Sequence, residues 1–281
     1  MAHDPIPKKS LGQHWLDDEL SLHNMLVAAD VQPGDAVLEI GPGLGSLTKL
    51  LTAAVGQVVA VEFDADLARG LPKRVKADNL RIVQSDILRF DLTTLPPDYK
   101  VVANIPYYLT SKLVRVLSES TNRPAIAALL VQKEVAERLA AKPGELSILG
   151  VTAQFYWEID LGPVVAAELF TPPPKVDSQI IVLKRREQLP FALASASTKQ
   201  NDTSGFGEPF DTRTYFRIVK AGFGARRKTL LNSLGGGLRL DKTATAQLLA
   251  QAGIHPGLRA QNLSLQEWYD LYRAYTGAAT V

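Results

Sequence analysis

The tetrapeptide Asn104-Ile105-Pro106-Tyr107 follows the apolar run Lys100-Val-Val-Ala103, which we expect to be a buried strand. An Asn side-chain oxygen and a backbone carbonyl held by the next proline can accept both hydrogens of an amino group on an aromatic ring. Such hydrogen bonds localise a nitrogen lone pair that is otherwise delocalised into the ring. Tyr107 would stack on that ring. The pattern predicts methylation of a ring amino group such as adenine N6, with Asn104, Pro106 and Tyr107 as catalytic residues.

A glycine-rich turn, Gly41-Pro42-Gly43-Leu44-Gly45, lies between an expected strand and an expected helix. Backbone N–H groups at such a turn face a bound ligand. The dinucleotide fingerprint Gly-x-Gly-x-x-Gly is not met, because Ser46 stands at the position of its third glycine. This spacing favours S-adenosylmethionine over NAD. Glu39 or its neighbours can offset the ammonium group of that cofactor.

Acidic residues mark the ends of the next two expected strands. Glu62 ends the second strand, where a carboxylate can accept both hydroxyls of a ribose. Asp86 ends the third and can accept from an adenine amino group, while the backbone N–H of Ile87 serves a ring nitrogen. Each acid alone is as easily a helix cap or a solvated turn residue. Acids at successive strand ends behind a glycine turn favour a cofactor site.

Apolar runs alternate with amphipathic stretches from about residue 35 to 185, which predicts an α/β fold with a mostly parallel sheet. Two later strands without a strong helix between them predict an antiparallel edge. The expected strands are 37–40, 58–62, 80–84, 100–103, 126–131, 155–161 and 179–183. The expected helices are about 17–29, 45–55, 65–76, 110–120 and 132–141.

The C-terminal part differs in composition from the rest. Residues 187–209 are rich in Ser, Thr, Ala and Gly, which predicts a flexible linker. Beyond them, helices are expected at about 211–222, 226–234, 241–252 and 264–275, with Gly235-Gly236-Gly237 as a turn. Residues 210–281 hold ten Lys/Arg against four Asp/Glu, whereas residues 1–209 hold 21 against 25. We therefore predict a catalytic domain over 1–186, a linker over 187–209 and a basic helical RNA-binding domain over 210–281.

Several classes of function are disfavoured by composition. The sequence has no cysteine, which excludes disulfides, thiolate metal sites and cysteine nucleophiles. The histidines show no metal-ligand spacing, so no metal is expected. No apolar run approaches the length of a membrane span, and we expect a cytoplasmic monomer.

Two further sets of residues are candidates for RNA contact. Arg226, Arg227 and Lys228 are expected to begin a helix, where positive charge is unfavourable unless an anion such as phosphate is near. Lys8 and Lys9 can extend this track. A target base must leave its stack to enter the reaction centre. Phe170, ahead of three prolines, is the candidate for its second stacking face, although a Phe in such a loop is as often a packing anchor.

Five segments together resemble the ribosomal RNA adenine dimethyltransferase family, over nearly the whole chain. They are Lys9–Leu16, Glu39–Gly45, Asn104–Tyr107, Phe170–Ser178 and Arg226–Leu234. The resemblance implies a Rossmann-like class I methyltransferase sheet and a small C-terminal helical domain. It also implies that S-adenosylmethionine is contacted at His14, Leu16, Gly41, Glu62, Asp86 and Asn104, the first two through an N-terminal segment that folds over the methionine end.

The last two of these segments resemble the small-subunit enzymes of the family more than those acting on large-subunit RNA. That implies N6,N6-dimethylation of two adjacent adenosines in the 3′-terminal hairpin loop of small-subunit (16S) ribosomal RNA, during assembly of the 30S subunit. His14, Trp15 and Tyr108 depart from the commoner Asn, Phe and Asn. The alternatives are a large-subunit (23S) RNA or a DNA adenine methyltransferase, a non-catalytic ribosome assembly factor, and an NAD-linked oxidoreductase.

Overall fold

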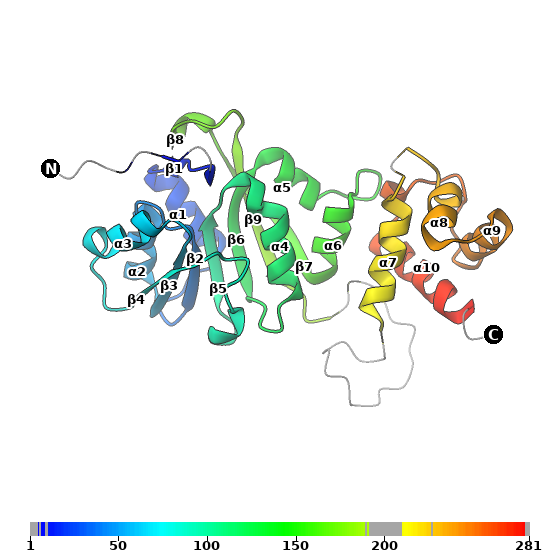
Figure 1. Cartoon of the computed structure of the whole chain (residues 1–281), viewed down its shortest axis with the longest axis horizontal. Coiled ribbons are helices and arrows are strands. Elements are labelled where there is room, and N and C mark those ends of the chain that lie inside the picture. Colours follow the sequence, from blue (N-terminus) through cyan, green and yellow to red (C-terminus); the bar gives the residue numbers. More distant parts are fainter. Residues whose placement is uncertain are drawn as a thin grey trace. The chain divides into compact units, whose positions relative to one another are not determined.

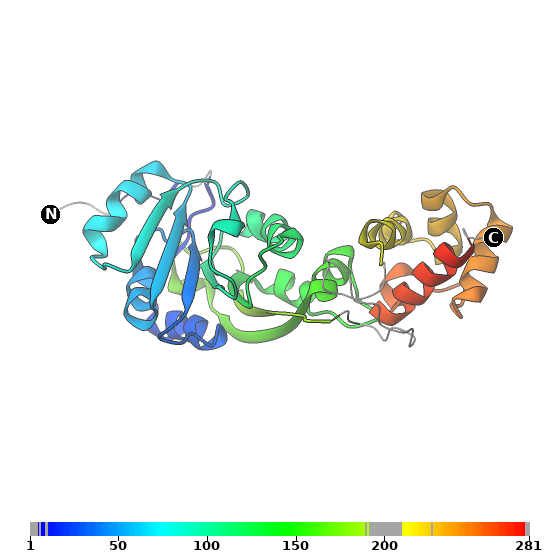
Figure 2. The ribbon, with the colours of Figure 1, turned by 90° about the horizontal axis from the view of Figure 1, so that it is seen from below.

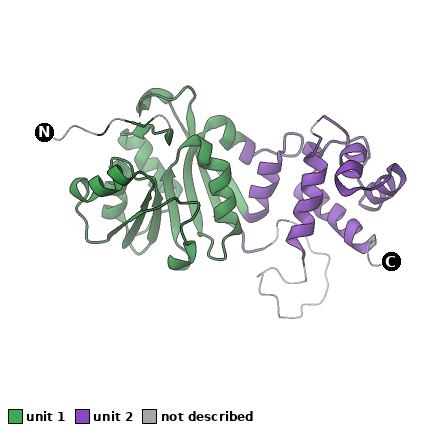
Figure 3. Ribbon diagram, in the orientation of Figure 1, with its two compact units in different colours: residues 1–137, 157–185 green, residues 138–156, 186–281 purple. Residues whose placement is uncertain are grey.

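The computed structural model describes residues 5, 7, 8, 11–188, 190, 210–225 and 227–278. Most of the predicted linker 187–209 lies outside these residues, as do Lys9 and Arg226. The chain divides into two compact units (Figure 3). Unit 1 comprises residues 1–137 and 157–185, and unit 2 comprises residues 138–156 and 186–281.

Unit 1 is built on a seven-stranded sheet with the strand order β4-β3-β2-β5-β6-β9-β7 among the described residues (Figure 1). Its strands are β2 (Ala36–Ile40), β3 (Gln57–Glu62), β4 (Leu80–Gln84), β5 (Lys100–Asn104), β6 (Ile126–Gln132), β7 (Trp157–Val165) and β9 (Ser178–Arg185). Neighbours from β4 to β6 run parallel, whereas β9 is antiparallel to both β6 and β7. The predicted α/β fold with an antiparallel edge is confirmed. Its central strands are buried on both faces, as parallel strands usually are.

Helices cover both faces of this sheet, with α1 and α2 on one side and α4 on the other (Figure 2). The helices of this part of the chain are α1 (Glu19–Ala28), α2 (Ser46–Ala54), α3 (Ala65–Arg74), α4 (Thr110–Glu119) and α5 (Lys133–Leu139). Asp18 and Asp64 begin α1 and α3 by accepting hydrogen bonds from first-turn amides. All five helices lie where the sequence predicted them, with ends within three residues.

A two-stranded sheet joins β1 (Trp15–Leu16) to β8 (Phe170–Thr171), and it was not predicted. Trp15 pairs with Thr171, and Leu16 pairs with Phe170. Strands of two residues carry too little periodicity to be recognised in a sequence. This pairing brings the N-terminal segment and the proline-rich segment after β7 to the same place.

Unit 2 is helical, with α6 (Ile148–Tyr156), α7 (Thr212–Phe223), α8 (Leu230–Leu238), α9 (Lys242–Gln251) and α10 (Leu265–Ala278). Its core is rich in aromatic side chains, including Phe155, Tyr215 and Trp268. Residues 138–156, which the sequence assigned to the catalytic domain, group with these helices. The reason is that Leu146, Val151 and Phe155 are buried in the unit 2 core.

Two sequence expectations in unit 2 are wrong. Gly235-Gly236-Gly237 does not form a turn, because all three residues lie inside α8. A Cβ atom added to Gly237 would lie 2.5 Å from Cβ of Ala221 on α7, so the glycine permits close packing of the two helices. The expected strand at 155 begins at Trp157, since residues 148–156 form α6, which the sequence analysis missed.

Candidate active site

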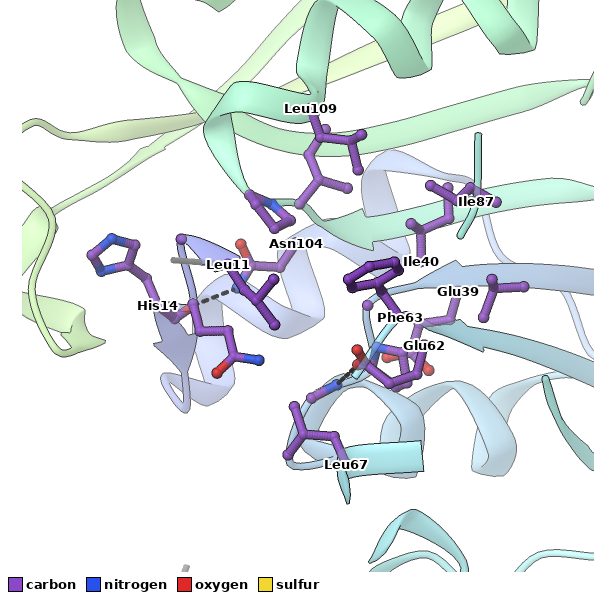
Figure 4. Close-up of a pocket in the computed structure, with 18 of the residues that line it drawn as sticks. Leu11, His14, Glu39, Ile40, Glu62, Phe63, Leu67, Ile87, Asn104 and Leu109 are labelled. Atoms are coloured by element: carbon purple, nitrogen blue, oxygen red, sulfur yellow. Dashed lines mark hydrogen bonds between the residues drawn. The ribbon is translucent and has the colours of Figure 1, made fainter. Parts of the chain in front are cut away.

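A cavity of about 310 Å³ opens at the carboxyl ends of β2, β3, β4 and β5 (Figure 4). In the sheet, β2 lies between β3 and β5. From β2 the chain first adds β3 and β4 on one side and then crosses over to add β5 on the other side, so the strand order reverses at β2. Ligands of doubly wound sheets bind at such a switch point. Every residue that the sequence proposed for catalysis or cofactor contact lines this cavity: His14, Leu16, Gly41, Glu62, Asp86, Asn104, Pro106, Tyr107 and Phe170.

The glycine turn after β2 approaches the cavity with its backbone. Gly41 and Gly43 have φ angles of +69° and +57°, which side-chain-bearing residues rarely adopt. A Cβ atom on Gly43 would lie 3.4 Å from the Trp15 ring. The positive φ angles thus explain the glycines, and the turn lies within contact distance of the N-terminal segment.

Glu62 ends β3 and is held by two backbone amides. Its Oε2 accepts from Gly43 N (3.1 Å), and its Oε1 accepts from Asp64 N (2.8 Å). Burial raises the pKa of this carboxyl group, while these hydrogen bonds oppose the rise. Each carboxylate oxygen can accept more than one hydrogen bond, so the group can still receive ribose hydroxyls.

Glu39 is 1% exposed and lines the same cavity. Neither carboxyl oxygen has a hydrogen-bond partner among the described residues. Burial raises its pKa to about 8; the nearby Thr48 hydroxyl opposes the rise, although no hydrogen bond of normal geometry joins the two, and Glu62 adds to it. A buried carboxyl group without a partner is costly, and a cationic ligand group would remove that cost.

Asp86 and apolar neighbours line the cavity at the carboxyl end of β4. Asp86 Oδ1 accepts from Leu88 N (3.0 Å), which fixes the carboxylate at the strand end. Ile87 is buried, whereas Phe63 is 58% exposed and also lines the cavity. Sequence reasoning missed Phe63, although its position directly after Glu62 was an available signal. Together these groups suit a flat heterocycle with an amino substituent.

The N-terminal segment 11–16 crosses the cavity and contacts the reaction centre. Asn104 Nδ2 donates to the backbone oxygen of His14 (3.3 Å; Figure 4). The imidazole Nδ1 of His14 donates to Pro172 O (2.6 Å), beside the β1–β8 pair. Since the amide nitrogen of Asn104 is bound in this way, its Oδ1 is left to accept a hydrogen bond from a ligand.

Tyr107 is held at both its ring and its hydroxyl group. A hydrogen bond of 2.7 Å joins its Oη to Ser178 Oγ, and burial raises the pKa of the phenol. Its ring stacks on the His14 imidazole, with centroids 6.0 Å apart and an interplanar angle of 18°. The ring orientation is therefore determined by two segments distant in sequence. The role of Ser178 was not predicted.

Phe170 lines the cavity but is only 2% exposed. It belongs to the core cluster that also contains Leu16, Leu22 and Val165. Phe170 thus packs in the core of unit 1, and its role as a stacking face for a target base stays a prediction.

The residues predicted to bind RNA have different surroundings. Lys8 forms ion pairs with Asp64 (2.8 Å) and Asp66 (3.1 Å), which raise the pKa of its ammonium group. Arg227 and Lys228 are exposed. They precede α8 rather than begin it, because Thr229 is the N-cap and Leu230 the first helical residue. The predicted helix start at 226 is wrong, and the argument from unfavourable charge inside a first turn no longer applies to these two residues.

No group of three or more histidine or acidic side chains in the described part of the chain is arranged to hold a metal ion. Within the same residues, no helix combines the length and apolar character needed to cross a membrane.

Comparison with known proteins places this site in a family. Residues 7–197 match the family model described as ribosomal RNA adenine dimethylase. The chain is 40% identical over 277 residues to the ribosomal RNA small subunit methyltransferase A of Dehalococcoides mccartyi strain 195, covering 96% of this chain and 88% of that protein. It is 37% identical to the protein of the same name from Moorella thermoacetica, covering 95% and 92%.

Solved structures share this architecture. A dimethyladenosine transferase from Plasmodium falciparum has the same fold, with a TM-score of 0.75 at 24% identity over 95% of this chain and 98% of that one. The 23S rRNA methyltransferase ErmE superposes with a TM-score of 0.69 at 27% identity, over 92% and 98%. Because the family model covers most of the sequence and curated relatives match almost end to end, the chain belongs to the ribosomal RNA adenine dimethylase family.

Proposed function

We propose that this protein transfers methyl groups from S-adenosylmethionine to N6 of two adjacent adenosines in the 3′-terminal hairpin loop of small-subunit (16S) ribosomal RNA, giving N6,N6-dimethyladenosine. The observation that carries the proposal is Asn104, whose amide nitrogen is bound by His14 O while its Oδ1 is left for a ligand in the cavity that also contains Glu39 and Glu62. The small-subunit names of the curated relatives support this RNA over the large-subunit alternative.

The cavity fits S-adenosylmethionine along its length. Glu39, buried without a partner among the described residues, suits the ammonium group of the cofactor, and the segment containing His14 and Leu16 also lines the cavity. Glu62 would accept the ribose hydroxyls, and Asp86 the adenine amino group. When bound, the cofactor supplies a sulfonium methyl group as the electrophile.

The chain's own contribution to the reaction lies at Asn104–Tyr107. Asn104 Oδ1 and the carbonyl oxygen of Ile105, held by Pro106, would accept the two N6 hydrogens of adenine. This arrangement favours a pyramidal nitrogen whose lone pair points at the methyl group. No nucleophilic side chain is required, because the cationic product can lose its proton to solvent.

The target base would be held by aromatic stacking. Tyr107 offers a ring whose orientation is set by Ser178 and His14. Phe170 would bound the other face, at the edge of the core. An adenine held in this way must leave its helix or occupy a single-stranded loop.

RNA binding would extend to the cations of unit 2. Arg227 and Lys228 are exposed and can contact phosphates; Lys9 and Arg226 belong to the same proposal. Lys8 can contribute only if phosphate competes with Asp64 and Asp66 for its ammonium group. The partner would be the assembling 30S subunit in the cytoplasm, bound by a monomer.

The test is methylation of purified ribosomal subunits that lack the modification, followed by mapping of the methylated base. We expect label from S-adenosylmethionine at two adjacent adenosines of the small-subunit hairpin loop, and transfer that is about 10²–10³-fold slower with Asn104→Ala. Label in large-subunit RNA would overturn the proposed substrate. Absence of any methyl transfer would instead favour a non-catalytic assembly factor.

A further inference from the structure

Two residues at the rim of the cavity have no part in the reaction proposed above. Tyr108 is 61% exposed and lines the cavity beside the reaction centre. Lys112, four residues later at the start of α4, is exposed and lines the same cavity. Tyr108 lies in the short 3-10 helix Tyr107–Leu109, which leads directly into α4. The rim therefore presents an aromatic ring and, four residues along the chain, a cation.

The two tyrosines of this segment are held in different ways. Tyr107 is fixed by Ser178 and His14, whereas the Tyr108 side chain forms no hydrogen bond or ring stack among the described residues and lies beside Gly12 of the N-terminal segment. A Cβ atom placed on Gly12 would lie 3.5 Å from Cδ1 and Cε1 of Tyr108. Folding thus leaves 61% of Tyr108 exposed, and this exposed part is available to a ligand.

The ammonium group of Lys112 is also unpaired among the described residues. It takes part in no ion pair among the described residues, whereas the neighbouring Arg115 is paired with Glu119 (2.8 Å) on the same helix. An unpaired ammonium group and an exposed aromatic ring at the same cavity match the two parts of a nucleotide, since the phosphate is anionic and any base has a stacking face.

We infer that Tyr108 and Lys112 form a subsite for the nucleotide adjacent to the adenosine in the reaction centre. Its base stacks on Tyr108, and its phosphodiester contacts Lys112. Removing one base from a stack exposes a face of its neighbour, and Tyr108 replaces the stacking that is lost. Stacking accepts any base, so this subsite contributes affinity rather than sequence selectivity. The inference rests on the proposed function, because it takes the reacting base to lie at Asn104.

The test compares Tyr108→Ala, Tyr108→Phe and Lys112→Ala with wild type. Lys49→Ala is the matched control, because Lys49 is exposed on α2, does not line the cavity and forms no ion pair among the described residues. Three quantities are measured: KM and kcat for methylation of purified small subunits, affinity for a fluorescent RNA hairpin with adenosines in its loop, and S-adenosylmethionine affinity by calorimetry.

We expect Tyr108→Ala to raise KM and weaken hairpin binding by about tenfold, within the range for loss of one stacked base. Tyr108→Phe retains the ring and should stay within about twofold of wild type on the same grounds. Lys112→Ala should weaken hairpin binding and lower the salt dependence of binding by about one unit of slope. Affinity for S-adenosylmethionine and kcat should match wild type in all variants.

Two results would overturn the subsite. One is equal hairpin affinity of wild type, Tyr108→Ala and Lys112→Ala. The other is a loss in Tyr108→Ala confined to S-adenosylmethionine affinity, which would mean that the ring only supports the N-terminal segment through Gly12. Failure of wild type to methylate small subunits would overturn the proposed function instead, while hairpin affinity would still decide the subsite.

Discussion

The two units bury different kinds of side chains. At the cavity of unit 1, Glu39 and Glu62 are 1% and 5% exposed. The core of unit 2 is apolar and aromatic around Phe155, and its cations Arg227 and Lys228 lie at the surface. Acidic groups are thus inside one unit, while basic groups are outside the other.

This difference matches the ligands proposed for the two units. A small cation can be enclosed, so the desolvation cost of a buried carboxylate is offset when the ligand binds. A polyanion is too large to enclose, and it is bound by exposed cations through release of counterions. The contrast teaches that the proposed cofactor site depends on burial and the proposed RNA surface on exposure.

The largest expected effect is at the reaction centre. Asn104→Ala removes the proposed acceptor for one N6 hydrogen, and we expect kcat to fall by about 10²–10³-fold. RNA affinity should stay within about twofold, since the stacking and phosphate contacts remain. Single-turnover methylation and hairpin binding measure the two quantities. A kcat near that of wild type would refute the role assigned to Asn104.

Glu62→Gln should weaken S-adenosylmethionine binding by about 10–100-fold. Hydrogen bonds to a charged group contribute about 1.5–3 kcal/mol. The amide also places N–H groups toward Gly43 N or Asp64 N, which already donate. Calorimetry measures the affinity, with Lys49→Ala as control. If the dissociation constant were unchanged, the ribose contact would have to be assigned elsewhere.

Replacing Arg227 and Lys228 together with alanine tests whether the exposed cations of unit 2 bind RNA. We expect the slope of log affinity against log salt to fall by about two, because two phosphate contacts are lost. Lys242→Ala on α9 serves as a single-charge control in the same unit. S-adenosylmethionine affinity should not change. An unaltered salt slope would show that these cations do not touch RNA.

The smallest expected effect concerns the pH dependence set by Glu39. With its pKa raised to about 8, the free protein keeps this group protonated near neutral pH, and a bound ammonium group would ionise it. Proton release should therefore accompany S-adenosylmethionine binding below about pH 7.5, where the ammonium stays charged. Calorimetry in buffers of different ionisation enthalpy detects the proton. Glu39→Gln should abolish the release.

The same pKa shift predicts how the free protein's stability depends on pH. From the ordinary value of 4.5 up to about 8, the folded state binds a proton that the unfolded state has lost. The free energy of unfolding should therefore fall as pH rises through this window, and the fall should be smaller in Glu39→Gln. Thermal melting across the window measures it. Parallel curves for the two proteins would contradict the assigned shift.

Strand-end residues were predictable because their positions depend on local pattern. An apolar run followed by Glu62 or Asn104 indicates a buried strand and a polar group at its carboxyl end, and parallel strands bring those ends together. The resemblance added His14 and Leu16 to this set. The end of α8 at Leu238 was less predictable, because glycines are weak helix formers and the close packing of Gly237 against Ala221 of α7 depends on the tertiary structure.

By itself, the sequence determined the α/β order, the polar groups at the strand ends and the acidic and basic halves, since these depend on residue type and spacing along the chain. Tertiary structure decided that Asn104 is oriented by His14 O, that Tyr107 is held by Ser178, and that residues 138–156 belong with unit 2. It also decided that Glu39 is buried without a hydrogen-bond partner among the described residues. These facts depend on contacts between residues far apart in the chain, for which local pattern carries no signal.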